Sequence, residues 1–267
     1  MADRYAVIGH PVAHSKSPWI HAEFARQTRE DLEYGRIEAP LDGFERTVDE
    51  FRSAGGRGAN VTLPFKDQAF RCCGNAVTER ARAVRVVNTL IFEKNIMRGD
   101  NTDGVGLLRD LSANLGRAIT DRRVLLMGAG GAAQGVLAPL IEARPRRLVV
   151  ANRTADKARA LARRYGASAG GGYEEFRREQ LDLVINATSA GLAGEAPPLA
   201  AAAFAPGALG YDMVYGRDTP FLALARAAGA AAHDGSGMLV EQAAESFFVW
   251  RGLRPDTAPV LAALRRR

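Results

Sequence analysis

Cysteine is almost absent from this 267-residue sequence, whose only two are the neighbours Cys72 and Cys73. Adjacent cysteines rarely bond to each other, and two thiols alone do not give the ligand spacing of a zinc site. The four histidines also lack metal-ligand spacing; they are His10, His14, His21 and His233. We therefore expect neither a disulfide framework nor a metal site.

A long apolar run is also absent. No stretch of about 18 uncharged apolar residues occurs, so we expect no membrane-spanning segment. The N-terminus reads MADRYAVIGH, with charges before a short apolar run and no small-residue cleavage site. We interpret it as the first strand of a cytoplasmic protein and not as a secretory signal.

The net charge of +6 comes from scattered arginines and the tail Arg265–Arg267. No arginine-rich helix or mixture of basic and aromatic residues is present, so we do not expect a nucleic-acid partner. An anionic small ligand explains a mildly basic site equally well. The composition, 47% hydrophobic and 25% charged, is typical of a globular protein, and the length suffices for two domains.

Short strands alternate with amphipathic helices along the chain. The pattern predicts strands at Tyr5–Ile8, Glu33–Glu38 and Ala59–Leu63, two strands around a turn at Glu93–Asn95, and helices at Trp19–Gln27, Asp42–Ala54, Thr78–Val84 and Asp103–Leu115. Four further strands follow, and they begin with RVLLM, RLVVA, LDLVIN and ALGYDM. A helix at Ala155–Tyr165 lies among these strands, and helices at Gly237–Trp250 and Pro255–Leu264 come after them. This order predicts α/β architecture with a parallel sheet covered on both faces in the second unit.

A glycine turn, GAGGAA at Gly128–Ala133, follows the strand RVLLM and opens a helix. It is a GxGxxA variant of the dinucleotide-binding pattern. Glycines let the backbone approach a pyrophosphate, whose charge then meets the N–H groups at the helix N-terminus. The strand–turn–helix context favours a dinucleotide site over a simple connection.

The strand RLVVA ends at Asn152, Arg153 and Thr154, about 24 residues after Gly128. An NAD enzyme usually has a carboxylate at this point, which accepts from the ribose 2′-OH and would repel a 2′-phosphate. An amide, a guanidinium and a hydroxyl can bind that phosphate. The sequence therefore predicts NADP as the cofactor, although a solvated arginine beside a helix N-cap remains the alternative interpretation.

Polar residues follow several strands of the N-terminal part. They are Ser15 and Ser17 in HSKSP, Asn60, Thr62 and Lys66 in NVTLPFK, Asn88 in VVNT, and Asp103 in GDNTDG. Taken singly, such residues are usually caps, turns or solvated groups. Together they suit a polyhydroxylated, anionic substrate.

These motifs together resemble the shikimate dehydrogenase family. In the family's order the chain contains GHPVAHSKSP, NVTLPFK, VVNT, GDNTDG, GAGGAA, NRT, NATSAG, YDMVY with TPF, and DGSGMLVEQAA. The resemblance implies an NADP-dependent oxidoreductase that reversibly reduces 3-dehydroshikimate to shikimate in the chorismate pathway of aromatic amino acid biosynthesis. It also implies two α/β domains with a cleft between them: a substrate-binding domain at 1–103, a Rossmann-type NADP-binding domain at 104–237, and C-terminal helices at 238–267 that pack back on the first.

The family's catalytic lysine and aspartate fall on Lys66 and Asp103. The resemblance assigns substrate binding to these two together with Ser15, Ser17, Thr62, Asn88, Tyr215 and Gln242. It assigns cofactor binding to Glu79, Gly128, Ala129, Gly130, Gly131, Ala132, Asn152, Arg153, Thr154, Thr188, Ser189, Ala190, Met213, Gly235 and Met238. The proton that reaches the new alkoxide would come from the lysine. A small-molecule substrate, no nucleic acid, no membrane and a monomer or homodimer are expected.

The chain departs from the family pattern where Arg85 and Val86 replace a small Gly–Ala pair before VNT, and this leaves the packing around Asn88 open. Ala22 also stands where Asn is usual, and Gly216–Arg217 replaces a proline-containing turn. Two rival functions remain. An NAD-dependent quinate/shikimate dehydrogenase would favour an acidic residue at 152–154, and a non-catalytic sensor of pathway intermediates would lack Lys66 or Asp103.

Overall fold

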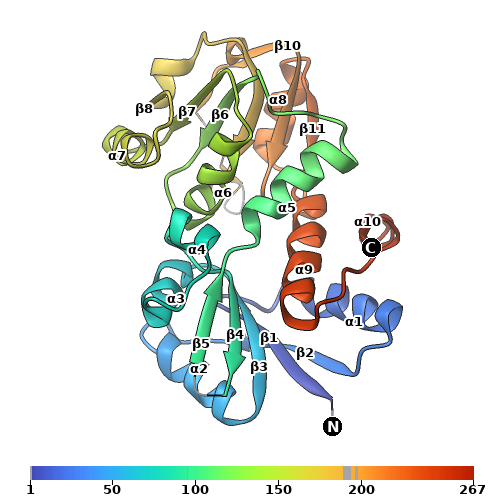
Figure 1. Ribbon diagram of the computed structural model, residues 1–267. Coiled ribbons are helices and arrows are strands. Elements are labelled where there is room, and N and C mark those ends of the chain that lie inside the picture. The colour runs from blue at the N-terminus through green and yellow to red at the C-terminus, as the bar shows by residue number, and fades with distance from the viewer. Residues whose placement is uncertain (1, 95, 189–193, 196–197) are drawn as a thin grey trace. The chain divides into compact units, whose positions relative to one another are not determined.

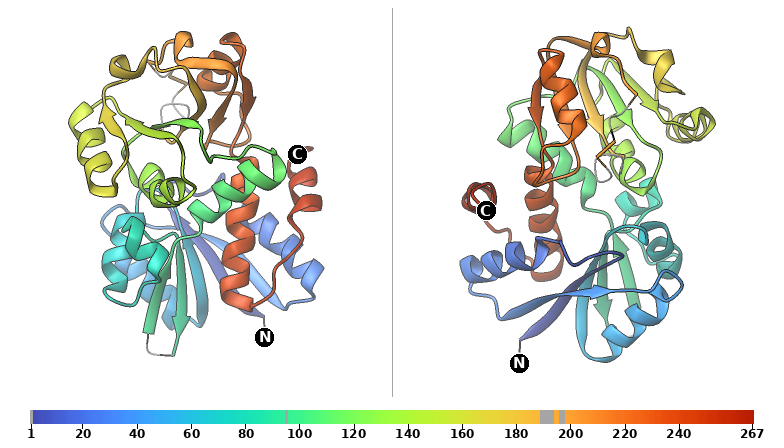
Figure 2. Two further views of the ribbon diagram at one scale, coloured as in Figure 1. Left: turned by 45° about the horizontal axis from the view of Figure 1, so that its top comes forward. Right: turned by 180° about the vertical axis from the view of Figure 1, so that it is seen from behind.

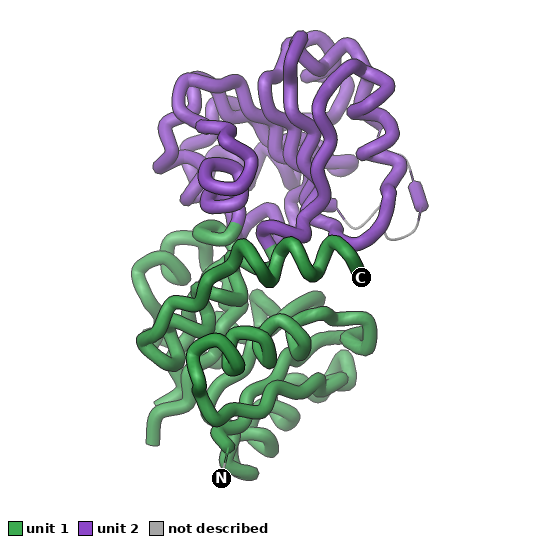
Figure 3. The backbone as a smooth tube through the Cα atoms, turned by 90° about the vertical axis from the view of Figure 1, so that its right-hand side faces the viewer, with its two compact units in different colours: residues 1–106, 239–267 green, residues 107–238 purple. Residues whose placement is uncertain are grey.

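The chain forms two compact units, coloured separately in Figure 3. The computed structural model describes residues 2–94, 96–188, 194–195 and 198–267. The first unit comprises residues 1–106 and 239–267, and the second comprises residues 107–238. The chain passes from one unit to the other within two helices, α5 (Asp103–Arg109) and α9 (Ser236–Arg251).

The first unit contains a five-stranded sheet of order β2-β1-β3-β4-β5 (Figure 1). Its strands are β1 (Asp3–Gly9), β2 (Leu32–Glu38), β3 (Gly56–Val61), β4 (Thr89–Glu93) and β5 (Ile96–Asp100). Strand β1 pairs in parallel with β2 and β3, whereas β4 runs antiparallel to β3 and β5. The predicted turn between β4 and β5 includes Asn95, which lies outside the described residues.

Helices cover both faces of this sheet (Figure 2). They are α1 (Ser17–Thr28), α2 (Phe44–Ser53), α3 (Lys66–Cys73), α4 (Glu79–Val84), most of α9, and α10 (Thr257–Leu264). Side chains of a strand alternate between faces, so neighbouring residues enter different cores. Ala59 packs in one core with α2 and α3, whereas Asn60 points to the other face and reaches Ser246 of α9.

Two helix boundaries in this unit have local causes. Helix α1 begins with Pro18 in its first turn, where the missing N–H of proline costs no hydrogen bond. Helix α4 begins after Thr78, whose hydroxyl accepts from the N–H of Ala81, and it ends at Arg85. Arg85 has φ +56°, a left-handed conformation that glycine adopts without strain.

The second unit contains a six-stranded sheet of order β11-β10-β9-β6-β7-β8, with every neighbouring pair parallel. Its strands are β6 (Arg123–Met127), β7 (Arg147–Ala151), β8 (Ala169–Gly171), β9 (Leu181–Asn186), β10 (Phe204–Asp212) and β11 (Ala231–His233). Counted from β6, this is the 3-2-1-4-5-6 order of a dinucleotide-binding sheet. The predicted fold class of two α/β domains, one of them Rossmann-type, is confirmed.

Helices lie on both faces of the second sheet as well (Figure 2). They are α6 (Gly131–Glu142), α7 (Ala155–Tyr165) and α8 (Pro220–Ala227), with short 3₁₀ turns at Tyr173–Phe176 and Ala201–Ala203. Val124 and Leu126 of β6 pack under α6 and α7, whereas Leu125 and Met127 face the core that contains α8. This alternation explains why β6 is apolar along its whole length.

The helix expected at Asp103–Leu115 changes type along its length. It is an α-helix to Arg109 and continues as a π-helix over Asp110–Asn114. The Tyr211 hydroxyl donates to Oδ2 of buried Asp110 at 2.6 Å, so a tertiary contact accompanies the change. Among the helices that the structure describes, none has the length and hydropathy needed to span a membrane.

Candidate active site

Lys66 and Asp103 form a shielded ion pair in the first unit. The Nζ atom of Lys66 lies 2.6 Å from Oδ2 of Asp103, and the two side chains are 13% and 7% exposed. Lys66 is the first residue of α3, and Asp103 is the first residue of α5. The structure thus brings together the two residues predicted to be catalytic, with an ammonium group held beside a carboxylate.

Asn88 holds the other carboxylate oxygen of Asp103. Its Nδ2 atom donates to Oδ1 of Asp103 at 2.8 Å, while its Oδ1 atom accepts from the backbone N–H of Thr102 at 2.9 Å. A backbone N–H can only donate, so this contact determines which end of the Asn88 amide faces the carboxylate. Both oxygens of Asp103 are therefore engaged, and the side chain has a defined orientation.

Buried hydroxyl groups surround the Asn88 amide. The Thr89 hydroxyl donates to Oδ1 of Asn88 at 2.8 Å, and the Thr102 hydroxyl lies 2.9 Å from its Nδ2 atom. Gln242 of α9 lies at the edge of this group, with Oε1 3.4 Å from Nδ2 of Asn88. Arg85 is exposed and makes its backbone hydrogen bond to Ala81, so its replacement of glycine leaves this network in place.

The HSKS loop places Ser15 and Ser17 at the start of α1, each 6% exposed. The backbone N–H of Ser17 donates to the Ser15 hydroxyl at 3.3 Å. Arg36 of β2 holds the loop by donating to the carbonyl oxygen of Ser15. Thr62 follows β3, is half-buried and donates its backbone N–H to Ile8 at 2.9 Å.

The glycine turn of the second unit lies between β6 and α6, at the C-terminal end of the sheet. Gly128 has φ +110°, and a Cβ atom there would lie 3.1 Å from the carbonyl oxygen of Ala187. The positive φ favours glycine strongly, and a side chain would also have to push the Ala187 carbonyl aside. Gly130 precedes the first turn of α6, whose N–H groups can receive an anion.

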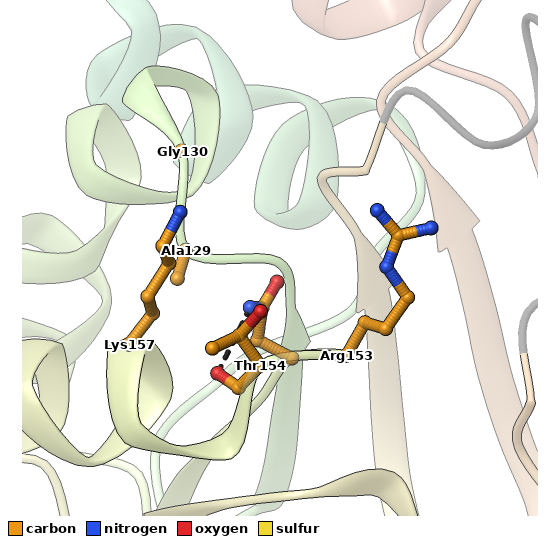
Figure 4. A pocket seen from close by; sticks show the side chains of 6 residues that line it. Ala129, Gly130, Arg153, Thr154 and Lys157 are labelled. Atoms are coloured by element: carbon orange, nitrogen blue, oxygen red, sulfur yellow. Dashed lines mark hydrogen bonds between the residues drawn. The ribbon is translucent and has the colours of Figure 1, made fainter.

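A hollow of about 210 Å³ lies beside this turn and is lined by Ala129, Gly130, Asn152, Arg153, Thr154 and Lys157. Figure 4 shows the Lys157 side chain extending toward Ala129 and Gly130, with Thr154 between Lys157 and Arg153. The Asn152 amide donates to the carbonyl of Thr154 at 3.1 Å. Two cations, an amide and a hydroxyl line the same hollow without a carboxylate, so its chemistry fits a phosphate group.

A buried polar network joins the ends of β9 and β10. Asn186 accepts from the backbone N–H and the hydroxyl of Thr188, and its amide donates to Oδ1 of Asp212 at 3.2 Å. Asp212 also accepts from the N–H of Val214 and the hydroxyl of Thr219. Burial raises the pKa of Asp212, against the effect of these hydrogen bonds. The network orders the segments that carry Thr188 and Met213.

The remaining predicted residues have the following positions. Glu79 is exposed at the first residue of α4, Tyr215 is half-buried after β10, and Gly235 and Met238 are buried at the start of α9. Ser189 and Ala190 lie outside the described residues. Over the described part of the chain, no group of His, Cys, Asp and Glu side chains is arranged to hold a metal ion.

Two residues of these sites were not predicted from the sequence. Lys157 lies in the first turn of α7, three residues after Thr154, and this closeness in sequence to the predicted phosphate-binding residues was an available signal. Arg36 carries no such signal, because its contact with Ser15 joins two separate elements.

Comparisons with known proteins agree over nearly the whole chain. The chain matches the shikimate dehydrogenase substrate binding domain over residues 7–90, shikimate/quinate 5-dehydrogenase over 110–193, and the shikimate 5′-dehydrogenase C-terminal domain over 235–265. A curated relative from Nitrosospira multiformis, named shikimate dehydrogenase (NADP(+)), is 58% identical over 270 residues, covering 99% of this chain and 98% of the relative.

Solved structures are similar too. An Ael1 enzyme from Pseudomonas putida has 49% identity and a TM-score of 0.91, over 98% of each chain. A shikimate 5-dehydrogenase from Thermus thermophilus, in complex with NADP(H) and shikimate, has 36% identity and a TM-score of 0.89, over 99% of each chain.

Proposed function

The chain belongs to the shikimate dehydrogenase family, and on that premise we propose how its own residues carry out the reaction. The protein is an NADP-dependent oxidoreductase that reversibly reduces 3-dehydroshikimate to shikimate, a step of the chorismate pathway in aromatic amino acid biosynthesis. The buried pair of Lys66 and Asp103 is the observation that carries the assignment of roles.

Lys66 is the general acid and base. When bound, NADPH supplies a hydride to the carbonyl carbon of the substrate. The Lys66 ammonium group then gives a proton to the oxygen that gains the negative charge, and in the reverse direction the amine takes that proton back. Asp103 orients the ammonium through the 2.6 Å contact, and Asn88 holds Asp103 in turn.

The substrate is polyhydroxylated and anionic, and the first unit offers it hydroxyl, amide and ammonium groups. We assign substrate contacts to Ser15, Ser17, Thr62, Lys66, Asn88, Asp103, Tyr215 and Gln242. The shielding of Ser15 and Ser17, each 6% exposed, supports their use as hydrogen-bonding groups, because a bond away from water contributes more to affinity.

NADP binds along the C-terminal edge of the second sheet. Arg153, Thr154 and Lys157, with Asn152 beside them, would hold its 2′-phosphate, and the N–H groups at the N-terminus of α6, at Gly128–Ala132, would hold its pyrophosphate. We assign the nicotinamide side to Glu79, and further cofactor contacts to Thr188, Ser189, Ala190, Met213, Gly235 and Met238. The hollow has cations where an NAD enzyme has a carboxylate, and this supports NADP over NAD.

We propose that residues 1–103 bind the substrate, that residues 104–237 bind NADP, and that the C-terminal helices at 238–267 pack on the substrate-binding part. We also propose a cytoplasmic enzyme that is a monomer or homodimer. Sedimentation of the purified chain distinguishes these two states.

The test of the function is NADPH absorbance after shikimate and NADP are added to the purified chain. The same assay is repeated with NAD and with quinate. We expect rapid NADPH formation with shikimate and NADP, and little reduced cofactor when NAD replaces NADP or quinate replaces shikimate. A preference for quinate with NAD would instead identify the quinate/shikimate enzyme that the sequence left as a rival.

A further inference from the structure

Tyr34 is a half-buried tyrosine to which the reaction above gives no role. It lies in β2, and its ring stacks on that of His21 from α1, with centroids 4.1 Å apart and planes 4° apart. Within the described chain, neither ring nitrogen of His21 has a hydrogen-bond partner. Burial lowers the pKa of His21 to about 3, so the imidazole is neutral. A neutral, flat ring therefore supports Tyr34 from one side.

The hydroxyl of Tyr34 donates to Oδ1 of Asn60 at 2.7 Å. Burial raises the pKa of Tyr34 well above its ordinary value, while the side chain of Ser17 acts in the opposite direction. The hydroxyl therefore keeps its proton over the working pH range and links β2 to β3 through Asn60.

The Asn60 amide has only one orientation that satisfies its neighbours. Its Nδ2 atom lies 3.1 Å from the carbonyl oxygen of Asn88, which can only accept, so the amide oxygen must face Tyr34. Nδ2 of Asn60 also donates to Thr89, whose hydroxyl donates to Oδ1 of Asn88. Each link from Tyr34 to Asn88 thus has a defined donor and acceptor.

We propose that Tyr34 is a positioning residue for the substrate: through Asn60 its hydroxyl holds Asn88 in the place where it meets shikimate. The inference rests on the proposed function, which assigns a substrate contact to Asn88. It requires an effect on shikimate and none on NADP, because no residue in this chain of contacts is assigned to the cofactor.

Tyr5 provides a matched control. It is the direct cross-strand neighbour of Tyr34 in the β1–β2 pair, and it too packs against Trp250. Its hydroxyl interacts with Arg251 of α9, whereas that of Tyr34 donates to Asn60. Tyr34→Phe and Tyr5→Phe therefore each remove one phenolic oxygen from paired positions of the same sheet. Only Tyr34→Phe removes a hydrogen bond to Asn60, and through it to the proposed substrate site.

The experiment compares both variants with the unaltered chain by steady-state kinetics in shikimate and NADP, with melting temperatures measured in parallel. Tyr34→Phe should raise the KM for shikimate about tenfold, because it leaves a buried acceptor unpaired, and should leave the KM for NADP unchanged. Tyr5→Phe should change neither constant. If Tyr34→Phe does not fold, Asn60→Ser removes the acceptor instead of the donor and must produce the same shikimate-specific defect.

If the unaltered chain is active and Tyr34→Phe has the same KM for shikimate as Tyr5→Phe, this inference is wrong while the proposed function stands. A parallel rise of both KM values, or a normal shikimate KM in Asn60→Ser, would also overturn the inference. An unaltered chain that does not oxidise shikimate with NADP would overturn the proposed function and this inference together.

Discussion

Arg36 donates two hydrogen bonds to one atom, the carbonyl oxygen of Ser15, from Nε at 3.0 Å and Nη2 at 2.6 Å. The planar guanidinium is suited to this forked contact, which a lysine cannot reproduce. The shape of the HSKS loop therefore depends on a side chain from an edge strand that comes later in the sequence.

Arg36→Lys should raise the KM for shikimate about threefold to tenfold, the loss expected for one or two hydrogen bonds. The KM for NADP should not change, because neither Arg36 nor Ser15 is assigned to the cofactor. Arg4→Ala is the control, since Arg4 also donates to a carbonyl, that of Ala54, from an exposed position in the same sheet. A normal shikimate KM in Arg36→Lys would show that the loop keeps its shape without the two hydrogen bonds from the arginine.

Lys66→Ala should lower turnover by about 10²–10⁴-fold, the usual contribution of a general acid or base. Shikimate should still bind, as measured by titration calorimetry without cofactor. Lys94→Ala removes an exposed lysine in the same unit and should have no effect. Near-normal turnover in Lys66→Ala would assign proton transfer to another group.

Arg153→Ala and Lys157→Ala should each weaken NADP binding by about ten- to a hundredfold, because each removes a charge-assisted bond to phosphate. NAD binding should barely change, since NAD lacks that phosphate. Asn152→Asp should shift the preference further, because a carboxylate repels the phosphate and accepts from a free 2′-OH. Dissociation constants for both cofactors provide the measurement.

Arg159→Ala is the matched control for this pair. Arg159 is on the same helix as Lys157 but is paired with Asp156 and Glu175. It should leave both dissociation constants unchanged. Equal losses of NAD and NADP affinity in Arg153→Ala would mean that Arg153 supports the adenine or the fold, and not the phosphate.

Glu245 of α9 links two arginines, Arg80 of α4 and Arg254. Burial would raise the pKa of Glu245, but hydrogen bonds and charge from both arginines outweigh it, and the net effect lowers the pKa. Stability from a lowered carboxyl pKa is present above the ordinary glutamate value of about 4.3 and is lost as the pH falls through the folded-state value.

Glu245→Gln should therefore destabilise the protein by about 2 kcal/mol at neutral pH, less than a fully buried pair because both arginines are partly exposed. The difference should shrink below pH ~4, where the unaltered carboxylate becomes protonated. Calorimetric melting at both pH values measures it. Glu174→Gln is the control: it breaks the exposed pair with Arg177 and should leave the melting temperature unchanged. If Glu245→Gln lowers the melting temperature by the same amount at all pH values, the electrostatic account is wrong.

Arg85→Gly should stabilise the protein by about 0.5–1 kcal/mol, because glycine adopts φ +56° without the strain that a Cβ atom adds. The exposed Ala83 lies inside the same short helix, so Ala83→Gly should instead cost about 0.5–1 kcal/mol. Opposite shifts in melting temperature are the expected result. A lower melting temperature in Arg85→Gly would show that the arginine side chain contributes more to stability than its left-handed backbone conformation costs.

Elements with strong local signals were predicted from the sequence. Helix α7 was predicted with its observed bounds, Ala155–Tyr165, since a polar cap follows an apolar strand there. Helix α3 was not, because Pro64 indicates the end of a strand and KDQAFRCC is short and polar. Strands β8 and β11 were missed because AGG and AAH have low strand propensity and are stabilised by pairing with β7 and β10.

Side-chain contacts between distant elements were beyond the sequence. Tyr34 and Asn60 are 26 residues apart on the two strands that flank β1, and the long tyrosine side chain reaches across β1 to the amide. The strand order supplies this contact, and no local motif encodes it. Lys157 was missed for a different reason, since a lysine on a helix surface is usually solvated and only the neighbouring glycine turn gives it a role.

The first unit is discontinuous in sequence, since residues 107–238 separate its two parts. During synthesis the whole second unit leaves the ribosome before most of α9 and all of α10 emerge. Until then Ile20 and Phe24 of α1 lack the core partners that these helices supply, among them Val240 and Phe247. The inserted unit can thus finish folding first, and the ordering of the substrate-binding half waits for the last segment to be translated.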